Sequence, residues 1–284
     1  MMPRNNLRKL FREGRPTVGT RYSCTWPDLV EIIGNSEEFD YAEFTGQYGP
    51  YTLHDLENLA RACELTSMDA MIKIDQEPRI FLATRAIQAG FTGMLFADCR
   101  TADDVRKCVE SVKLIPQGGI DGLQSGRMMG YGTVRGRPVT LEDYVKYIDD
   151  IVIAIMIETK SLVDDIEEAL SVTGIDMVQF GPSDFSISIG RAGKGILDEP
   201  TSALDASGKG YEDPQIAEAL ERSYEVAKRK GIRIRAECNV EDMQKWIDIG
   251  CKDFSIGTDT QTISAWAKNT GNAIRENLAK GNLL

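Results

Sequence analysis

Two carboxylates follow two apolar stretches near the middle of the chain. Glu158 comes directly after the run AIMI, and Asp184 follows MVQFGPS. A carboxylate at the C-terminal end of a parallel strand lies at the mouth of an α/β sheet or barrel, the face where active sites are built. Two of them, with no nearby His or Cys, form a hard-oxygen site suited to Mg²⁺ or Mn²⁺. Alternatively each caps the following helix, with Asp184 as N-cap of a turn at Phe185–Ile189; the occurrence of two in register favours a metal.

Short apolar runs alternate with amphipathic helical patterns along the chain. The predicted strands are Thr17–Tyr22, Tyr41–Thr45, Ala70–Ile74, Gly93–Phe96, Val152–Ile157, Met177–Phe180, Ile232–Ala236 and Asp253–Ile256. The predicted helices are Trp26–Gly34, Leu53–Glu64, Arg79–Ala89, Thr101–Ser111, Leu141–Asp149, Leu162–Ser171, Pro214–Lys230, Val240–Ile249 and Thr262–Ala279, with a short amphipathic helix near the N-terminus.

Eight strands alternating with helices predict an α/β fold, a (β/α)8 TIM barrel with long βα loops and an extra C-terminal helix. We expect residues 1–284 to form this one barrel domain, since barrels of this length are common. A doubly wound open sheet is the alternative, but no G-x-G-x-x-G follows the first strand.

Composition narrows the class of partner. The chain has 33 basic and 44 acidic residues and a net charge of −11, so nucleic acid and anionic membranes are not expected partners. No apolar run is long enough to span a bilayer, and the N-terminal residues lack the apolar centre of a signal peptide. Six scattered cysteines without a CxxC pair predict reduced, mostly buried thiols and a cytoplasmic location.

Two glycine-rich segments are additional to the strands and helices of a minimal barrel. They are Ile115–Pro138, which carries Arg127, and Arg191–Tyr211. Long loops in a compact domain are usually lids or binding loops, and we expect both to cover the mouth. The first could instead cover a contact between subunits.

The order of motifs resembles the HpcH/HpaI family of metal-dependent pyruvate aldolases over roughly Leu10 to Ala279. FDYAEF, IKID, AGFTGMLF, IMIET and GPSDFSISIG follow one another as in that family, and the E-T pair with GPSDFS is the most specific part. The resemblance implies a divalent metal, Mg²⁺ or Mn²⁺ with Co²⁺ possible, bound by Glu158 and Asp184. It also implies a small-molecule 2-oxo acid substrate whose carboxylate lies against Gly181, Pro182 and Ser183.

The resemblance further implies a homo-oligomer, a hexamer built from dimers that exchange a C-terminal helix. At several positions this chain also departs from the residues that are usual in the family. Where the family has Asp-x-Glu-His after the second strand, this chain has Thr45-Gly46-Gln47-Tyr48. Lys73 replaces an arginine that polarises the keto oxygen, Met156 replaces a glutamine, and Ala97-Asp98 replaces a proline. The metal half of the site is therefore kept, and the acid–base half is rewritten.

Strand alternation suggests how the rewritten half is arranged. If Thr45 faces the mouth, Glu43 lies one layer deeper, and Met71 and Lys73 point inward on the next strand. A Glu43–Lys73 pair is then expected, either as a buried structural ion pair or as a catalytic one. In the second case Lys73 stabilises an enolate oxygen; a Schiff base would require a lowered pKa.

Candidates for the proton-transfer group are Tyr48, Asp98 and a metal-bound water. A phenol is a poor base unless a cation lowers its pKa, and Tyr48 could equally be a packing residue. Asp98 could reach the mouth or bond backbone in the DCRTADD turn. Arg127 could bind a distal substrate group or lie on the surface, and Glu237 could line the mouth or cap the next helix.

Three functions remain open from sequence. The first is a lyase that cleaves a carbon–carbon bond of a 2-oxo acid to give pyruvate or a pyruvate-like enolate, which the metal and Lys73 neutralise. The second is a 2-oxo-dicarboxylate decarboxylase or a hydrolase on the same site, which needs no base on a hydroxyl. The third is a non-catalytic barrel that binds a metal–oxo-acid complex.

Overall fold

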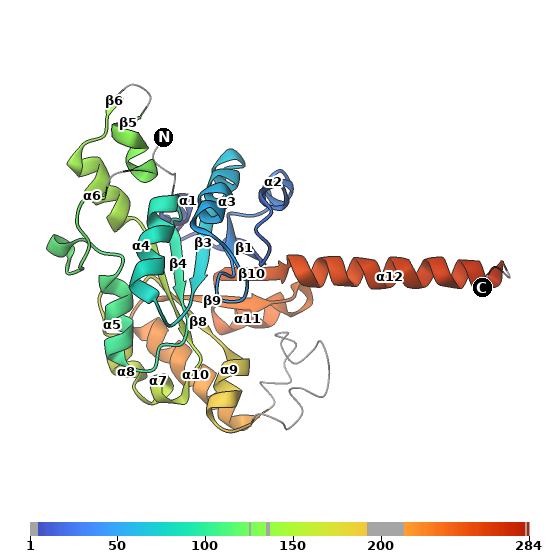
Figure 1. Ribbon diagram of the computed structural model, residues 1–284. Coiled ribbons are helices and arrows are strands. Elements are labelled where there is room, and N and C mark those ends of the chain that lie inside the picture. Colours follow the sequence, from blue (N-terminus) through green and yellow to red (C-terminus); the bar gives the residue numbers. More distant parts are fainter. Residues whose placement is uncertain (1–4, 125, 135–136, 192–212, 282, 284) are drawn as a thin grey trace.

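Eight parallel strands close into a barrel in a computed structural model that describes residues 5–124, 126–134, 137–191, 213–281 and 283 (Figure 1). Around the barrel the strands follow the order β1-β10-β9-β8-β7-β4-β3-β2, and β1 pairs with both β10 and β2. The barrel strands are β1 Thr17–Tyr22, β2 Tyr41–Phe44, β3 Asp69–Ile74, β4 Gly93–Phe96, β7 Val152–Ile157, β8 Met177–Phe180, β9 Arg233–Cys238 and β10 Asp253–Thr258. This closure confirms the predicted barrel and excludes the open sheet.

Helices surround the barrel and connect most of the strands. They are α1 Asn6–Arg12, α2 Pro27–Gly34, α3 Leu53–Leu65, α4 Arg79–Ala89, α5 Ala102–Glu110, α6 Leu141–Asp149, α7 Lys160–Asp164, α8 Ile166–Ala169, α9 Pro182–Ser188, α10 Pro214–Arg229, α11 Met243–Ile249 and α12 Asp259–Lys280. Capping boxes at Thr52, Thr101 and Thr140 determine where α3, α5 and α6 begin, because each threonine and the aspartate three residues later satisfy each other's backbone N–H groups.

The predicted element bounds hold closely, but two predicted helices are divided. The helix expected at Val240–Ile249 begins as a 3-10 turn at Val240–Asp242, and α11 follows it. The helix expected at Leu162–Ser171 is split into α7 and α8 at Asp165, which has φ −99° and ψ 13°. The Asp165 carboxylate accepts a hydrogen bond at 3.0 Å from the backbone N–H of Ala102, at the start of α5. A tertiary contact therefore decides this break, and no local signal announced it.

The barrel interior is filled by side chains that alternate along each strand. An apolar layer of Tyr41, Met71, Leu95, Met156 and Met177 packs together with Leu7 from α1. The Tyr41 hydroxyl crosses to donate to the carbonyl of Phe254 at 3.0 Å. Its ring leaves no space at Gly19, where an added Cβ would lie 2.2 Å from the ring. The interior is therefore a packed core below the mouth.

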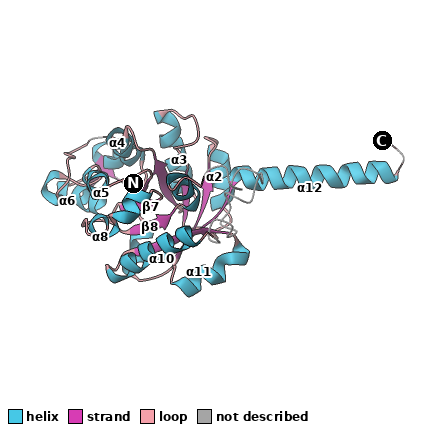
Figure 2. Cartoon of the chain, turned by 90° about the horizontal axis from the view of Figure 1, so that it is seen from below, coloured by secondary structure: helices cyan, strands magenta, loops and turns pink. Residues whose placement is uncertain are grey.

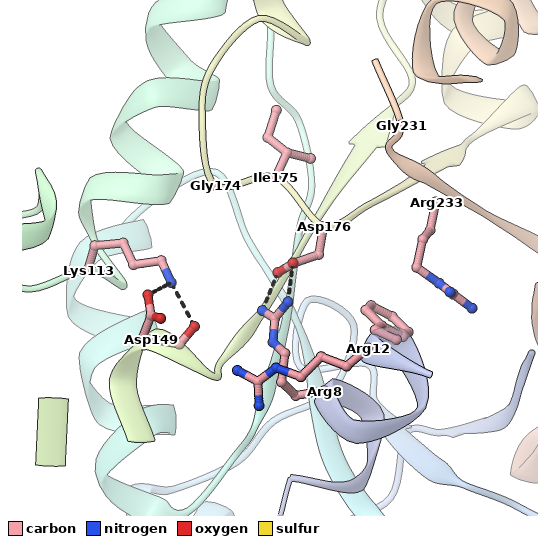
Figure 3. Close-up of a pocket in the computed structure, with 10 residues that line it drawn as sticks. Arg8, Arg12, Lys113, Asp149, Gly174, Ile175, Asp176, Gly231 and Arg233 are labelled. Atoms are coloured by element: carbon pink, nitrogen blue, oxygen red, sulfur yellow. Dashed lines mark hydrogen bonds and ion pairs between the residues drawn. The ribbon is translucent and has the colours of Figure 1, made fainter. Parts of the chain in front are cut away.

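Helix α1 closes the opposite end of the barrel, where the strands begin (Figure 3). Arg8 is bidentate to Asp176, with distances of 2.5 and 2.7 Å, and also donates to the carbonyls of Asp150 and Ile151. A pocket of about 510 Å³ lies beside it, and the basic side chains lining it, such as Lys113 with Asp149, already have acidic partners. These contacts hold α1 in place at the end of the barrel remote from Glu158.

The first glycine-rich segment does not lie over the mouth, so that expectation is wrong. It follows helix α5 instead of a strand, and it folds into short 3-10 turns and the hairpin β5 Thr133–Val134 and β6 Arg137–Pro138. Figure 1 shows this hairpin above α6, on the side away from α7 and α9. The second segment, apart from Arg191, lies outside the described residues.

Helix α12 extends far from the barrel as a single rod of 22 residues, and both views show its end standing clear of the rest (Figures 1 and 2). Along it Ile263, Trp266 and Ile274 are more than half exposed. Within the described ranges, no helix combines the length and apolar character needed to cross a membrane.

Candidate active site

Glu158 directly follows β7 and is 1 % exposed. Its Oε1 accepts a hydrogen bond of 2.6 Å from the backbone N–H of Asp98, while Oε2 is buried with no partner among the described residues. Burial raises the pKa of Glu158 to about 7, although Lys73 and the Asp98 N–H oppose the shift. Thr159, not Glu158, caps α7 through its hydroxyl, so the capping interpretation of Glu158 is wrong.

Asp184 is the third residue of α9 and is exposed to solvent. Gly181 occupies the N-cap position, so Asp184 does not cap this helix either. Its charge contributes to raising the pKa of both Glu158 and Tyr48, which places the three groups within electrostatic reach of one another. Because β7 and β8 are neighbours in the barrel, the two carboxylates follow adjacent strands at the mouth.

Lys73 points into the upper barrel from β3 and is 5 % exposed. Its Nζ donates to the hydroxyl of Tyr48 at 2.7 Å and lies 4.7 Å from the centre of that ring. Burial alone would lower the pKa of Lys73, but Glu158, Tyr48 and Glu43 together raise it above its ordinary value. The ammonium group therefore keeps its proton, which suits charge neutralisation and removes the Schiff-base alternative.

Tyr48 lies in the loop after β2 and is 63 % exposed, so it is not a packing residue. Partial desolvation at the mouth raises the pKa of Tyr48, and the opposing effect of Lys73 does not compensate. The phenol therefore stays protonated near neutral pH and cannot serve as a base, but it can donate a hydrogen bond or a proton.

Asp98 reaches the mouth with a left-handed backbone, φ 55°, which few residues other than glycine, asparagine and aspartate adopt. Its Oδ2 accepts from Nε2 of Gln47 at 2.9 Å. The backbone N–H groups of the following turn are taken by Asp104 instead, so the alternative role of Asp98 in that turn is wrong. Gln47, which the sequence marked only as a departure, is thereby joined to Asp98, the residue whose N–H contacts Glu158.

The turn at Gly181 packs directly against Glu158. A Cβ at Gly181 would lie 2.8 Å from Cβ and 3.0 Å from Oε2 of Glu158, so only glycine fits there. The Gly181 N–H donates to the carbonyl of Ile157 at 2.9 Å, and Pro182 has no N–H. Backbone donors for an anionic ligand are therefore left to Ser183 and Asp184, in the first turn of α9.

The expected Glu43–Lys73 pair does not form. Glu43 is opposite Met71 in the strand register, and its carboxylate pairs with Arg235 of β9 at 2.5 Å. Both side chains of that pair are at most 1 % exposed. Arg235 lies on β9, three strands away from β2 around the barrel, so its guanidinium reaches across the interior to Glu43. Lys73 remains within electrostatic reach of Glu43 but has Tyr48 as its hydrogen-bond partner.

Arg127 does not reach the mouth either. It donates to the carbonyl of Ala89 at 2.6 Å and pairs with Glu64 at 2.7 Å. Both partners lie at the C-terminal ends of helices, which is the end of the barrel where the strands begin, so the expected contact with substrate is wrong for this chain.

Sequence reasoning missed Arg21 and Gln179, two polar side chains on the far wall of the mouth. Both contact Glu237: Arg21 forms an ion pair with its Oε1 at 2.6 Å, and Gln179 donates a hydrogen bond to its Oε2 at 3.1 Å. Glu237 therefore lines the mouth and does not cap the next helix. Strand alternation could have found them, because Arg21 shares a face with Gly19 and Gln179 shares one with Met177. His54, in contrast, is exposed, as expected.

The donor set fits a divalent cation with oxygen ligands. The unpartnered Oε2 of Glu158 is a buried, hard-oxygen group that a cation would satisfy, and Asp184 adds a second carboxylate. Among the described residues no group of three or more His, Cys, Asp or Glu side chains is arranged to hold a metal. A cation here would therefore need further oxygens from the ligand or water.

Comparisons with known proteins show relatives that match this chain over most of its length. A family model described as HpcH/HpaI aldolase/citrate lyase matches residues 39–264. A 4-hydroxy-2-oxovalerate aldolase of Novosphingobium aromaticivorans is 27% identical over 277 residues, covering 96% of this chain and 94% of that one. A 4-hydroxy-2-oxo-heptane-1,7-dioate aldolase of Shigella flexneri is 23% identical, covering 98% and 97%. An HpcH/HpaI aldolase of Desulfitobacterium hafniense shares the fold, with a TM-score of 0.79 at 23% identity and coverage of 95% and 96%.

Proposed function

Because the chain belongs to the HpcH/HpaI aldolase/citrate lyase family and is a carbon–carbon lyase, we propose that it cleaves a 2-oxo acid with the help of a divalent metal. The product is pyruvate or a pyruvate-like enolate. The observation that carries this proposal is the buried, unpartnered Oε2 of Glu158, with Asp184 in the helix that follows the neighbouring strand β8. A solvent-excluded carboxylate oxygen of this kind is costly to leave unpaired, and a bound cation removes that cost.

Each group at the mouth has a defined task in the cleavage. Glu158 and Asp184 would hold Mg²⁺ or Mn²⁺, which supplies positive charge to the keto and carboxylate oxygens of the substrate. Lys73 keeps its proton and places a second positive charge beside Glu158, where the enolate oxygen develops. The backbone N–H groups of Ser183 and Asp184 can receive the substrate carboxylate. The Tyr48 hydroxyl, held by Lys73, can return a proton to the enolate carbon.

A second candidate function follows from the acid–base half. Aldol cleavage needs a group that removes a hydroxyl proton, and Tyr48 holds its own proton, so that proton would have to pass to Asp98, whose Oδ1 is not used by Gln47, or to water. Decarboxylation of a 2-oxo dicarboxylate requires only the charge neutralisation that Glu158, Asp184 and Lys73 provide. Converting Thr45→Asp and Tyr48→His should raise aldol cleavage over decarboxylation if the rewritten half limits the first reaction.

The deciding experiment measures pyruvate release with Mg²⁺ or Mn²⁺ from oxaloacetate and from 4-hydroxy-2-oxo acids. Wild-type protein should release pyruvate, and Glu158→Gln should lose at least about 100-fold in kcat/KM, since it loses a charged ligand. Glu167→Gln, which changes an exposed partner of Arg229, is the matched control and should retain activity. Metal-dependent binding of 2-oxo acids without any turnover would instead identify a non-catalytic binding barrel.

We further propose that α12 joins this chain to other copies in a homo-oligomer. The helix extends away from the barrel (Figure 2). Its side chains Ile263, Trp266 and Ile274 are exposed in one chain. Exposed large apolar residues on one rod are typical of an interface. Trp266→Glu should lower the mass measured by light scattering, whereas Lys268→Glu on the same helix should not. A monomeric wild-type protein would contradict this assembly.

We also infer a cytoplasmic location. All six cysteines are free, and five of them are buried. Thiols that persist unpaired are typical of a reducing compartment. Recovery of the native protein in the periplasmic or secreted fraction of its source cells would contradict this location.

A further inference from the structure

The wall of the mouth opposite β3 carries a polar group that the metal and Lys73 do not use. Oε1 of Glu237, on β9, pairs with Nη1 of Arg21 at 2.6 Å, and its Oε2 accepts from Nε2 of Gln179 at 3.1 Å. The amide orientation of Gln179 follows from chemistry, because a carboxylate can only accept hydrogen bonds and so must face the nitrogen. One carboxylate therefore positions a guanidinium from β1 and an amide from β8.

This arrangement leaves one donor and one acceptor without a partner. Nε of Arg21 and Oε1 of Gln179 are both buried and unpaired among the described residues, and Gln179 is only 2 % exposed. Buried polar atoms in native proteins nearly always have a partner, so the two free atoms indicate a group that they are built to receive. A single group that satisfied both atoms would accept from Arg21 and donate to Gln179.

A hydroxyl group meets this requirement and a carboxylate does not. A hydroxyl both accepts and donates, whereas a carboxylate only accepts and would be opposed by Oε1 of Gln179 and by the charge of Glu237. Arg21 and Glu237 already neutralise each other, so no net positive charge remains to attract a second carboxylate. An alkyl chain would leave both atoms unpaired.

The polar group lies on the same side of the barrel as the proposed metal carboxylates, with Gln179 one layer below Glu158. Gln179 is paired in register with Met156, two residues before Glu158, and Asp184 follows Gln179 on the same segment. We propose that Arg21 and Gln179, positioned by Glu237, bind a hydroxyl on the tail of the 2-oxo acid. The substrate class is then a polyhydroxylated 2-oxo acid with an uncharged tail, of the kind derived from sugar acids. This assignment rests on the proposed 2-oxo acid site.

The test uses calorimetric titration of the full chain with Mg²⁺ and three six-carbon ligands: 2-oxohexanoate, 5,6-dihydroxy-2-oxohexanoate and 2-oxohexanedioate. None has the C4 hydroxyl that aldol cleavage requires, so binding is measured without turnover. The wild type should bind the dihydroxy acid at least about 10-fold more tightly than the other two. This preference should fall to within about threefold in Gln179→Leu and in Arg21→Lys, which keeps the charge opposite Glu237 but removes Nε–H. Arg229→Met, at an exposed pair with Glu167, is the matched control and should keep the preference.

Two results would overturn the subsite: equal or tighter binding of the alkyl or dicarboxylate ligand by the wild type, or an unchanged preference in both variants. Arg21→Lys preserves the ion pair, so it remains informative if Gln179→Leu does not fold. Pyruvate release from oxaloacetate, measured in parallel, reports separately on the proposed function. Turnover without hydroxyl preference would remove only the subsite, and hydroxyl preference without turnover on any substrate would remove only the lyase.

Discussion

The backbone N–H of Asp98 donates to Oε1 of Glu158 at 2.6 Å and leaves Oε2 of the same carboxylate buried and free. This contact joins the end of β4 to the end of β7, its neighbour in the barrel. It depends on an unusual backbone at Asp98, with φ 55°. The orientation of the proposed metal ligand is therefore fixed by a main-chain group whose conformation the side chain at position 98 must tolerate.

The backbone at Asp98 yields the first prediction. Asp98→Ala should lower the free energy of unfolding by about 1–2 kcal/mol, because alanine is strained at this φ. Asp98→Asn should cost less, since asparagine tolerates this conformation and can still accept from Gln47. Urea denaturation measures the stability, and Mn²⁺ titration should show weaker binding in Asp98→Ala. If Asp98→Gly is no more stable than Asp98→Ala, backbone strain is not the cause.

Lys73 and Tyr48 should act as one unit. Lys73→Met should reduce kcat/KM for pyruvate release by about 100-fold or more, because a preorganised charge at the enolate oxygen is lost. Tyr48→Phe should reduce it less, about 10-fold, since Lys73 keeps its charge. In the double variant the losses should be less than additive, as expected for side chains joined by a 2.7 Å hydrogen bond. Unchanged turnover in Tyr48→Phe would contradict a role for its hydroxyl.

Removing one partner of the buried pair Glu43–Arg235 should destabilise the fold much more than removing both partners together. Arg235→Met leaves Glu43 as an uncompensated buried charge and should lower the free energy of unfolding by about 3–5 kcal/mol. The combined Glu43→Leu and Arg235→Met variant should recover most of that loss, because both charges are then gone. Urea denaturation of the three proteins tests this. A double variant as unstable as Arg235→Met would mean that the pair has another structural task.

Asp69 should make stability depend on pH. It is 2 % exposed, and burial raises the pKa of its carboxyl to about 7, against hydrogen bonds from Leu7 and Thr92. The folded state thus favours the protonated form. The raised pKa of Asp69 therefore stabilises the folded state fully below pH 3.8, and this stabilisation is lost as the pH rises through 7. It amounts to about 4 kcal/mol, at ~1.4 kcal/mol per pKa unit.

Urea denaturation between pH 5 and 8 measures this effect of Asp69. The free energy of unfolding should fall with rising pH more steeply in the wild type than in Asp69→Asn, which has no titrating group there. Parallel curves for the two proteins would show that Asp69 is already ionised at pH 5.

The repeating elements of the barrel were predictable from local pattern. Strands such as Val152–Ile157 and Gly93–Phe96 begin and end at the predicted residues, because buried parallel strands read as short apolar runs. Glu158 and Asp184 were identified for the same reason, since each follows such a run. The location of Ile115–Pro138 was not predictable, because a glycine-rich segment has no local signal for the end of the barrel it occupies.

The sequence by itself determined the order of strands and helices and which side chains point into the barrel, because both depend on spacing along the chain. Only the tertiary structure decided which inward-facing side chains meet. Glu43 pairs with Arg235, nearly the whole barrel away in sequence, and Arg21 pairs with Glu237. Closure of the sheet brings β9 and β10 round to β1, and a local pattern contains no information about partners that only closure creates.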